Sequence, residues 1–488
     1  MRRAAAALLV TTLAVSAGAA AMVVRPDRTR GDAFLFGDEG HNLWVASALA
    51  GGAELYTEAY TPYGPAGVWV YRVAASLGGN SAATYQALNV ALSAGSLVLL
   101  QQALARSGSL AWSVAWTLAA MAPMMLAPGS LLGGLTVSSY VGLERLLLCG
   151  IVWGWRPPDA RAARRSVLLG CVAGALLWVK FGTTALAVVG VIAADLAHRR
   201  AWRSTLLFVA GAAAVVAMFV VWAVLRFPPH VAADLVWPSF LLESYAWVTP
   251  GVRWPSFTPA LVVAQYGPPL TGLALCGAAI AARQMSPPMR LALMLLAIFM
   301  AGSVLTFRHA HHFRQYAWLL AAAGGFAAVG FGKRWRIAAV LAVVPACVVA
   351  ARDLLPPAAQ TVRVTTPAAG TVFLSPEVSS RSAAIAEHIE QARARGERIL
   401  VAPNASGWHA AYGIPIPGRH GWFLGGATRP WEYDAAVSHF ERLSAVMICA
   451  GSEDRWEQLH LPPSVFARVR PLFPVEGRVG DCALWRRR

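Results

Sequence analysis

Apolar stretches separated by short basic connections dominate the first three quarters of this 488-residue chain. An initial apolar run covers residues 4–24. Further stretches begin near Thr84, Leu110, Val141, Ser166, Thr183, Ser204, Pro259, Arg290, Gln315 and Ile337. A helix of about 20 apolar residues spans a bilayer, so the pattern predicts a polytopic α-helical membrane protein with about 11 transmembrane helices.

The composition excludes an ordinary soluble globular protein. Apolar residues make up 57% of the sequence and charged residues 13%, whereas about 25% charged residues is usual for soluble proteins. The net charge of +17 comes largely from Lys and Arg between the apolar stretches. Because membrane topology accounts for basic residues in such places, the charge does not indicate a nucleic-acid partner.

The basic connections also predict the orientation of the chain. They cover residues 156–165, 198–203, 283–290 and 333–336. With eleven helices, all of them lie on the side of Arg2 and Arg3, and this side is expected to be cytoplasmic because Lys and Arg accumulate there. The outer side then receives residues 25–83, residues 226–258 and everything after Arg352.

The first apolar run, residues 4–24, has two interpretations. It follows Met1-Arg2-Arg3 and ends in small residues, as a cleaved signal peptide would. We favour an uncleaved first helix, because the run is long enough to span.

The chain divides into a membrane part, residues 1–353 with a first outer loop over 25–83, and a tail over 354–488. The tail is rich in charge, Pro and Gly, and its pattern predicts a small extracytoplasmic α/β domain. A helix is expected near 382–395 and strands at 398–402 and 445–450. Cys449 and Cys482 would pair if the tail faces an oxidising compartment, although spacing alone does not establish this.

The first outer loop contains adjacent carboxylates. Asp38 and Glu39 stand at the start of an amphipathic stretch that contains Leu43, Trp44 and Leu49 and resembles an interfacial helix. Such carboxylates can act as a general base or a cation ligand at a membrane surface. Alternatively, Asp38 caps the helix and Glu39 complements its dipole, which local physics alone favours.

This loop resembles the first outer loop of GT-C glycosyltransferases, in particular the family 39 group of protein O-mannosyltransferases and aminoarabinose transferases. The resemblance lies in Asp38-Glu39-Gly40, Gly52, Leu55-Tyr56 and Tyr63-Gly64-Pro65. It implies that Asp38 is the catalytic base, with Glu39 beside it, and that His41, Tyr56 and Tyr63 line the acceptor or donor pocket. Aminoarabinose transferases carry a Lys where this chain has Tyr63-Gly64, so the resemblance does not identify the substrate.

Two further stretches fit the same resemblance. Residues 174–181 look like a family helix that ends in a basic residue, and this implies that Lys180 binds the lipid phosphate. Residues 307–316 look like the family's basic and aromatic outer segment. They imply phosphate binding by Arg308 and Arg314, and a pocket lined by residues of the same segment, namely His309, His312 and Tyr316. Lys180 could instead be a snorkelling lysine, and the histidines a polar loop or metal ligands, although they lack i, i+4 spacing.

Glu144 and Arg145 form a charged pair at the rim of a predicted spanning helix. Charged residues in such places are candidates for function. The resemblance implies that Glu144 is a second carboxylate of the site, while the competing explanation is an ion pair with Arg145 or a neighbour. A divalent cation between Asp38 and Glu144 is a further hypothesis.

The resemblance implies transfer of a sugar from a polyprenyl-phosphate donor in a bacterial inner membrane. A lipid, a glycan or a protein could be the acceptor, and neither the sugar nor the acceptor can be read from these residues. A lipid or sugar transporter, or flippase, would require polar residues deep in several helices, and the sequence has few. A non-catalytic membrane scaffold is the remaining alternative.

Overall fold

The computed structural model describes residues 35, 38–125, 139–156, 161–197, 202–238, 259–307, 310–354, 362–402, 405–416, 418–420, 428–449 and 456–488. The chain forms two compact units. Unit 1 is built from Asn89–Val221 and Arg253–Pro356, and unit 2 from Pro26–Leu88, Trp222–Val252 and Pro357–Arg488. The units therefore group the chain differently from a single division at residue 354, because the first outer loop and residues 222–252 belong with the tail.

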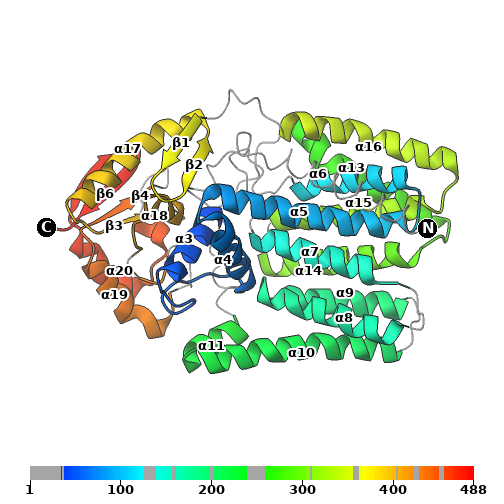
Figure 1. The fold of residues 1–488 in the computed structure, drawn as a ribbon, viewed down its shortest axis with the longest axis horizontal. Helices are drawn as coiled ribbons and strands as arrows, with labels where there is room; N and C mark the ends of the chain where they lie inside the picture. The colour runs from blue at the N-terminus through cyan, green and yellow to red at the C-terminus, as the bar shows by residue number, and fades with distance from the viewer. Residues whose placement is uncertain are drawn as a thin grey trace. The chain divides into compact units, whose positions relative to one another are not determined.

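Helices build unit 1 (Figure 1). They are α5 (Ala82–Ala105, which begins in unit 2), α6 (Leu110–Met125), α7 (Ser139–Gly154), α8 (Ala162–Ala175), the 3-10 turn η1 (Leu176–Trp178), α9 (Thr183–Ala197), α10 (Trp202–Arg226, which ends in unit 2), α13 (Pro259–Ala281), α14 (Pro287–Phe307), α15 (Ala310–Ala328) and α16 (Lys333–Leu354). Each predicted start after residue 25 lies within five residues of a helix start, and the largest offset is that of Gln315 against Ala310. The predicted first helix, over residues 4–24, lies outside the described residues.

The apolarity of these helices varies. Of the described helices, α5 and α10 are long and apolar enough to cross a membrane by length and composition, and several others are apolar but shorter. Only 28% of the most apolar window of α10 is buried, and Leu206, Met218, Val224 and Leu225 are exposed. A mostly exposed apolar helix is unlike the core helix of a soluble protein and requires apolar surroundings.

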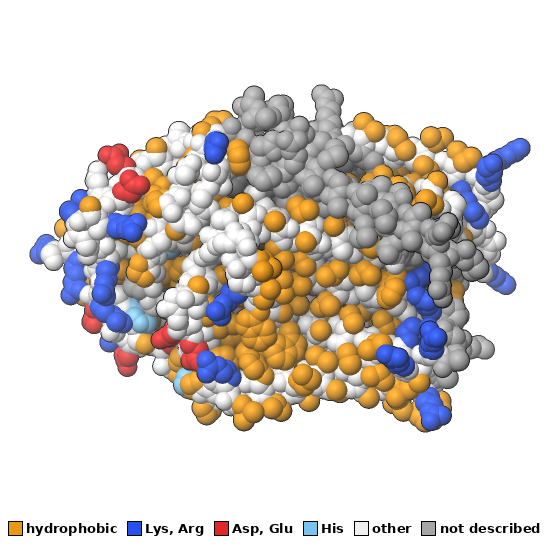
Figure 2. Space-filling model, in the orientation of Figure 1, with side chains coloured by type: hydrophobic (Ala, Val, Ile, Leu, Met, Phe, Trp, Pro, Cys, Tyr) orange, Lys and Arg blue, Asp and Glu red, His pale blue; other side chains and the backbone are white. Residues whose placement is uncertain are grey.

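The surface of unit 1 shows the same separation of residue types. Orange hydrophobic side chains spread over its helices, and blue Lys and Arg side chains gather at one end of them (Figure 2). The sequence places basic residues at the helix starts, with Arg164 and Arg165 in α8, Arg290 in α14 and Lys333 in α16. An apolar band with a basic end is typical of a helical membrane protein.

Glycines allow α8 and α10 to cross at close range. A Cβ atom at Gly170 would lie 2.0 Å from the carbonyl oxygen of Phe208, and one at Gly174 would lie 2.7 Å from that of Ala212. Gly211 faces the carbonyl of Val167 from the other helix. The spacing of Gly170 and Gly174 is the small-xxx-small pattern by which membrane helices bring their backbones together.

Unit 2 combines the first outer loop with an α/β tail. The tail carries a hairpin of β1 (Val362–Thr366) and β2 (Gly370–Leu374), and a sheet in the order β3-β4-β6-β5. The sheet strands are β3 (Ile399–Ala402), β4 (Ala445–Ile448), β5 (Val475–Val479) and β6 (Cys482–Arg486). Among these four strands, β3 and β4 pair in parallel, and the other two pairs are antiparallel. The helices of the tail are α17 (Pro376–Ala394), α18 (Ser406–Tyr412), the turn η4 (Pro430–Glu432), α19 (Tyr433–Glu441), the turn η5 (Trp456–Leu459), α20 (Pro463–Val469) and the turn η6 (Arg470–Leu472).

Local predictions for the tail are confirmed. The expected helix corresponds to α17, and the expected strands to β3 and β4. Ser375 caps α17, because its side chain accepts a hydrogen bond from the amide of Val378. Cys449 and Cys482 form a disulfide that joins the ends of β4 and β6.

The helix expected after Asp38 is α3 (Asp38–Ala50). It is followed by α4 (Ala66–Gly78), and the segment 222–252 contributes α11 (Pro229–Val236). Residues 39–46 of α3 are all buried, and α18 of the tail packs against the helix. The helix is therefore an internal element of unit 2, although its sequence resembles that of an interfacial helix.

Candidate active site

A buried ionic cluster lies in unit 1, where α7, the turn after η1 and α15 meet. The hydroxyl of Tyr316 donates a hydrogen bond of 2.7 Å to Oε1 of Glu144. Nζ of Lys180 lies 3.8 Å from Oε2 of the same carboxylate and donates to Oε1 of Gln315 at 3.4 Å. Glu144, Lys180 and Tyr316 are all buried. The sequence analysis nominated these three residues separately, and the structure brings them together.

The chain reversal between α8 and α9 positions Lys180. Gly182 has φ +82°, a left-handed conformation that glycine adopts without steric cost. The hydroxyl of Thr183 donates to the carbonyl of Lys180 at 2.7 Å and thereby closes the turn. Lys180 is 7% exposed. Its ammonium group therefore lies inside the unit instead of reaching out of it as a snorkelling lysine would.

Glu144 has partners on both oxygens, Tyr316 on one and Lys180 on the other. The ion pair expected for this residue thus forms with Lys180. A cation at Glu144 would have to displace one of these partners, and among the described residues no three His, Cys, Asp or Glu side chains gather as metal ligands.

Most of the nominated residues near the start of α15 lie outside the part of the chain that the structure describes. Arg308 and His309 lie outside the described residues. His312 and Arg314 belong to α15, but their side chains also lie outside the description. Tyr316 is therefore the only nominated residue of residues 307–316 whose side chain is described.

The proposed base, Asp38, is the first residue of α3 in unit 2, and its side chain lies outside the description. Glu39 and His41 follow it and are buried. Nδ1 of His41 lies 3.4 Å from the hydroxyl of Ser406 in α18. Burial lowers the pKa of His41 to about 3, although a hydrogen bond with the backbone of Tyr60 acts in the opposite direction. His41 is therefore neutral at physiological pH.

Tyr56 and Tyr63 stabilise the first outer loop itself. The hydroxyl of Tyr56 donates to the backbone carbonyl of Tyr63 at 2.7 Å. The ring of Tyr56 packs edge-on against Trp222 and Phe227, and burial raises the pKa of its hydroxyl. Tyr56 also has φ +67°, a strained backbone conformation for a residue with a side chain. These contacts indicate a structural role for the two tyrosines that were nominated as pocket residues.

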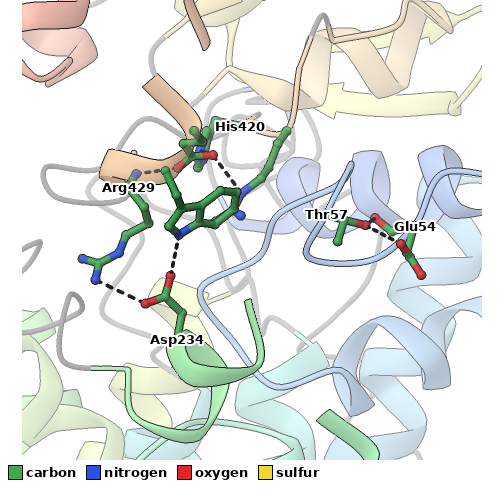
Figure 3. Close-up of polar contacts among 8 residues, drawn as sticks. Glu54, Thr57, Asp234, His420 and Arg429 are labelled. Carbon is green, nitrogen blue, oxygen red and sulfur yellow. Dashed lines mark hydrogen bonds and ion pairs between the residues drawn. The ribbon is translucent and has the colours of Figure 1, made fainter. Parts of the chain in front are cut away.

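A second polar network, in unit 2, was not found from the sequence (Figure 3). Nε2 of His420 lies 3.1 Å from Oε2 of Glu432, and Nε of Arg419 lies 3.3 Å from the same oxygen. The guanidinium group of Arg419 stacks between the rings of Tyr60 and Trp431, 4.9 and 4.7 Å from their centroids. Residues from the first loop and from the tail therefore share one buried centre.

The network continues into α11. Arg429 pairs with Asp234 at 3.2 Å, and the indole of Trp431 donates to the same carboxylate at 3.4 Å (Figure 3). Burial alone would raise the pKa of Glu432, but His420, Arg419 and the backbone amide of Arg429 hold it below its usual value. Glu432 is therefore ionised and compensates the buried Arg419.

The sequence carries only a weak signal for this network. Arg419-His420 follows the Pro- and Gly-rich residues 415–418, and a basic pair in such a stretch resembles an ordinary surface turn. Tyr60, which contacts this pair, and Asp234, which contacts Arg429, lie far away in the sequence, so no local spacing connects them.

Comparison with known structures identifies the fold of this chain. No family model matches the sequence, and no curated protein matches it. The structure of ArnT from Cupriavidus metallidurans bound to undecaprenyl phosphate has a TM-score of 0.60 and 13% identity, over 99% of this chain and 98% of that one. The chain has the ArnT fold. The apo structure of ArnT gives a TM-score of 0.59 and 14% identity over the same shares.

An Archaeoglobus fulgidus oligosaccharyltransferase tethered to an acceptor peptide is less similar, with a TM-score of 0.48 and 11% identity over 90% of this chain and 68% of that one. That likeness is too weak to carry an argument. The likeness to ArnT covers nearly the full length of both chains, and it confirms the resemblance to GT-C glycosyltransferases at the level of the fold.

Proposed function

We propose that this chain is a membrane glycosyltransferase. It transfers a sugar from a polyprenyl-phosphate donor to an acceptor on the outer face of a bacterial inner membrane, with Asp38 as the general base. The observation that carries the proposal is the buried cluster of Lys180, Glu144 and Tyr316 in a chain with the ArnT fold. Fold alone does not determine activity, so the proposal depends on the chemistry of this cluster.

The proposed reaction inverts the anomeric carbon. The carboxylate of Asp38 removes the proton of an acceptor hydroxyl while the acceptor oxygen bonds to the anomeric carbon. The bond from that carbon to the phosphate oxygen breaks at the same time, and the polyprenyl phosphate leaves with the electron pair. Negative charge develops on the leaving phosphate, so stabilisation by fixed cations lowers the barrier.

Lys180, Arg308 and Arg314 are the cations proposed for the leaving phosphate. Lys180 supports this role because its ammonium group is buried and kept inside the unit by Glu144 and Gln315. An ammonium group has three N–H donors, and Glu144 and Gln315 account for two of them, so the third can donate to a phosphate oxygen. The ArnT structure of the same fold is bound to undecaprenyl phosphate, and this supports a polyprenyl phosphate as the ligand class. The proposal includes His41, His309 and His312 as pocket residues.

The proposed location is a bacterial inner membrane, crossed several times, with the N-terminus in the cytoplasm and the tail outside. The exposed apolar surface of α10 and the basic helix ends of unit 1 support membrane insertion. The disulfide between Cys449 and Cys482 supports an oxidising compartment for the tail, because thiols stay reduced in the cytosol of most bacteria.

Sugar transfer tests the proposal directly. Purified protein in proteoliposomes receives a radiolabelled glycosyl polyprenyl phosphate and an envelope extract as the source of acceptors. We expect transfer by the parent protein and by Glu58→Gln, an exposed carboxylate of the same loop. Asp38→Asn should be at least 100-fold slower, because a lost general base typically costs this much. Equal transfer by Asp38→Asn and the parent would refute the assignment of the base.

A further inference from the structure

Arg145 is the buried charged residue of unit 1 that the proposed function does not use. It lies in α7 directly after Glu144 and is 3% exposed. Its Nε and Nη1 atoms are buried, and neither has a hydrogen-bond partner among the described residues. The guanidinium group interacts electrostatically with the carboxylate of Glu144 and therefore belongs to the same cluster.

The charges of the side chains that the structure describes in this cluster do not balance. The buried charged side chains of unit 1 that the structure describes are Glu144, Arg145, Lys180 and Asp195. Asp195 accepts hydrogen bonds from Trp155 at 2.9 Å and from Thr205 at 3.2 Å. It lies in α9, twelve residues after Thr183, so the helical rise places it about 18 Å from the turn that holds Lys180. The described side chains of this cluster therefore carry two positive charges, on Arg145 and Lys180, and one negative charge, on Glu144.

That carboxylate is already used by Tyr316 and Lys180. A guanidinium group that is buried without a partner costs several kcal/mol, because neither water nor an anion replaces its hydration. In membrane helices, such groups occur where they meet an anion or a water-filled path. An additional anion at this position would balance the cluster and occupy the unpaired donors.

We infer that Arg145 is a phosphate-binding residue and that, together with Lys180, it holds the phosphate of the polyprenyl-phosphate donor. This inference rests on the proposed function and adds a residue to its site. The guanidinium group suits phosphate oxygens, since it presents several N–H donors in fixed directions, whereas Lys180 contributes a point charge. Glu144 then keeps Lys180 in place and is not itself a ligand of the donor.

The inference predicts opposite effects on stability and on binding. Without ligand, Arg145→Met should have a higher melting temperature than the parent, because the variant removes an uncompensated buried charge. A purely structural arginine would behave in the opposite way and lower the melting temperature on removal. Arg156→Met serves as the matched control, because Arg156 follows the other end of α7 and rests on the ring of Trp153.

Binding is measured with the full chain in detergent by the rise in melting temperature with undecaprenyl phosphate, undecaprenol, phosphatidylglycerol and inorganic phosphate. We expect the parent and Arg156→Met to prefer undecaprenyl phosphate over undecaprenol. Arg145→Met should bind undecaprenyl phosphate at least tenfold more weakly, and Arg145→Lys should be intermediate, because charged hydrogen bonds contribute this much. A response to inorganic phosphate or phosphatidylglycerol that equals the response to undecaprenyl phosphate and disappears in Arg145→Met would support the phosphate site and assign it a different source of phosphate.

The outcomes separate the two proposals. If the parent prefers undecaprenyl phosphate and Arg145→Met binds it as tightly, the role of Arg145 is overturned and the proposed function stands. A lower melting temperature of ligand-free Arg145→Met would also overturn it, because Arg145 would then be a structural residue. If the parent shows no preference for undecaprenyl phosphate over undecaprenol, the polyprenyl-phosphate donor itself is refuted.

Discussion

Replacing Cys449 and Cys482 by alanine removes the covalent link between the ends of β4 and β6. The two cysteines are separated by 33 residues in sequence. In the chain-entropy description, opening a loop of this length releases unfolded-state entropy that corresponds to about 4 kcal/mol at 25 °C. The rest of the sheet is unchanged, since β4 and β6 keep their antiparallel pairing from Ala445 to Ile448. The loss should therefore appear as lower stability of a correctly folded tail.

Urea-dependent pulse proteolysis of the full chain in detergent measures this loss, because it reports the unfolding of the tail without requiring the membrane part to unfold. With a denaturant dependence of about 2 kcal/mol per molar urea, the cleavage midpoint should fall by about 2 M. Cys171→Ala is the control, because Cys171 is a free cysteine of unit 1. An unchanged midpoint in the double variant, or reactive thiols at both positions in protein isolated from cells, would refute the reasoning and remove the support for an outer tail.

Other parts of the molecule give further expectations. Burial lowers the pKa of His409 to about 4, so the folded state is favoured above pH 6.5 and loses up to about 3 kcal/mol as the pH falls to 4. Denaturation at a series of pH values should show this loss, and His409→Gln should reduce the dependence. Glu144→Gln should cost about 3–5 kcal/mol in thermal unfolding, since it leaves the buried ammonium group of Lys180 without its carboxylate, and Glu144→Gln combined with Lys180→Met should cost less. Gly170→Val should cost about 3 kcal/mol or prevent accumulation in membranes, because its side chain would meet the backbone of α10. Gly277→Val should be tolerated, because a Cβ there has no neighbour within 4 Å, and equal levels of both variants would contradict the close crossing.

Features with a local signal were predictable from the sequence. Helix starts follow from apolar stretches and from the residues that interrupt them, and this is why the predicted start at Leu110 coincides with that of α6. Lys180 was identified because residues 174–181 resemble a family helix that ends in a basic residue. The strands β3 and β4 were predictable because both are short, fully apolar and bounded by loops.

Features that depend on distant partners were not predictable. His41 and Ser406 are 365 residues apart and yet lie 3.4 Å from one another. The burial of Arg419 is explained by its contacts with Tyr60 and Glu432, and no sequence motif links these three residues. The hydrogen bond of 2.7 Å between Tyr316 and Glu144 was also not predictable, because the two residues are 172 positions apart in the sequence. Glu144 and Tyr316 were each nominated from the sequence, but their contact was not.

The composition of unit 2 constrains the topology independently of any count of Lys and Arg. The unit is built from Pro26–Leu88, Trp222–Val252 and Pro357–Arg488. A compact unit lies on one side of a bilayer, so the chain between consecutive segments must cross the membrane an even number of times. Among the described residues, the helices between the first two segments are α5 to α10, six in sequence, and those between the last two are α13 to α16, four in sequence.

If each of these helices crosses once, both numbers are even, and the three segments are the ones that the basic connections assign to the outer side. One missed or additional crossing in either group would place part of a single sheet-and-helix unit on the wrong side of the membrane. The agreement of this parity with the charge distribution is therefore the strongest support for an outer location of the helix that begins at Asp38.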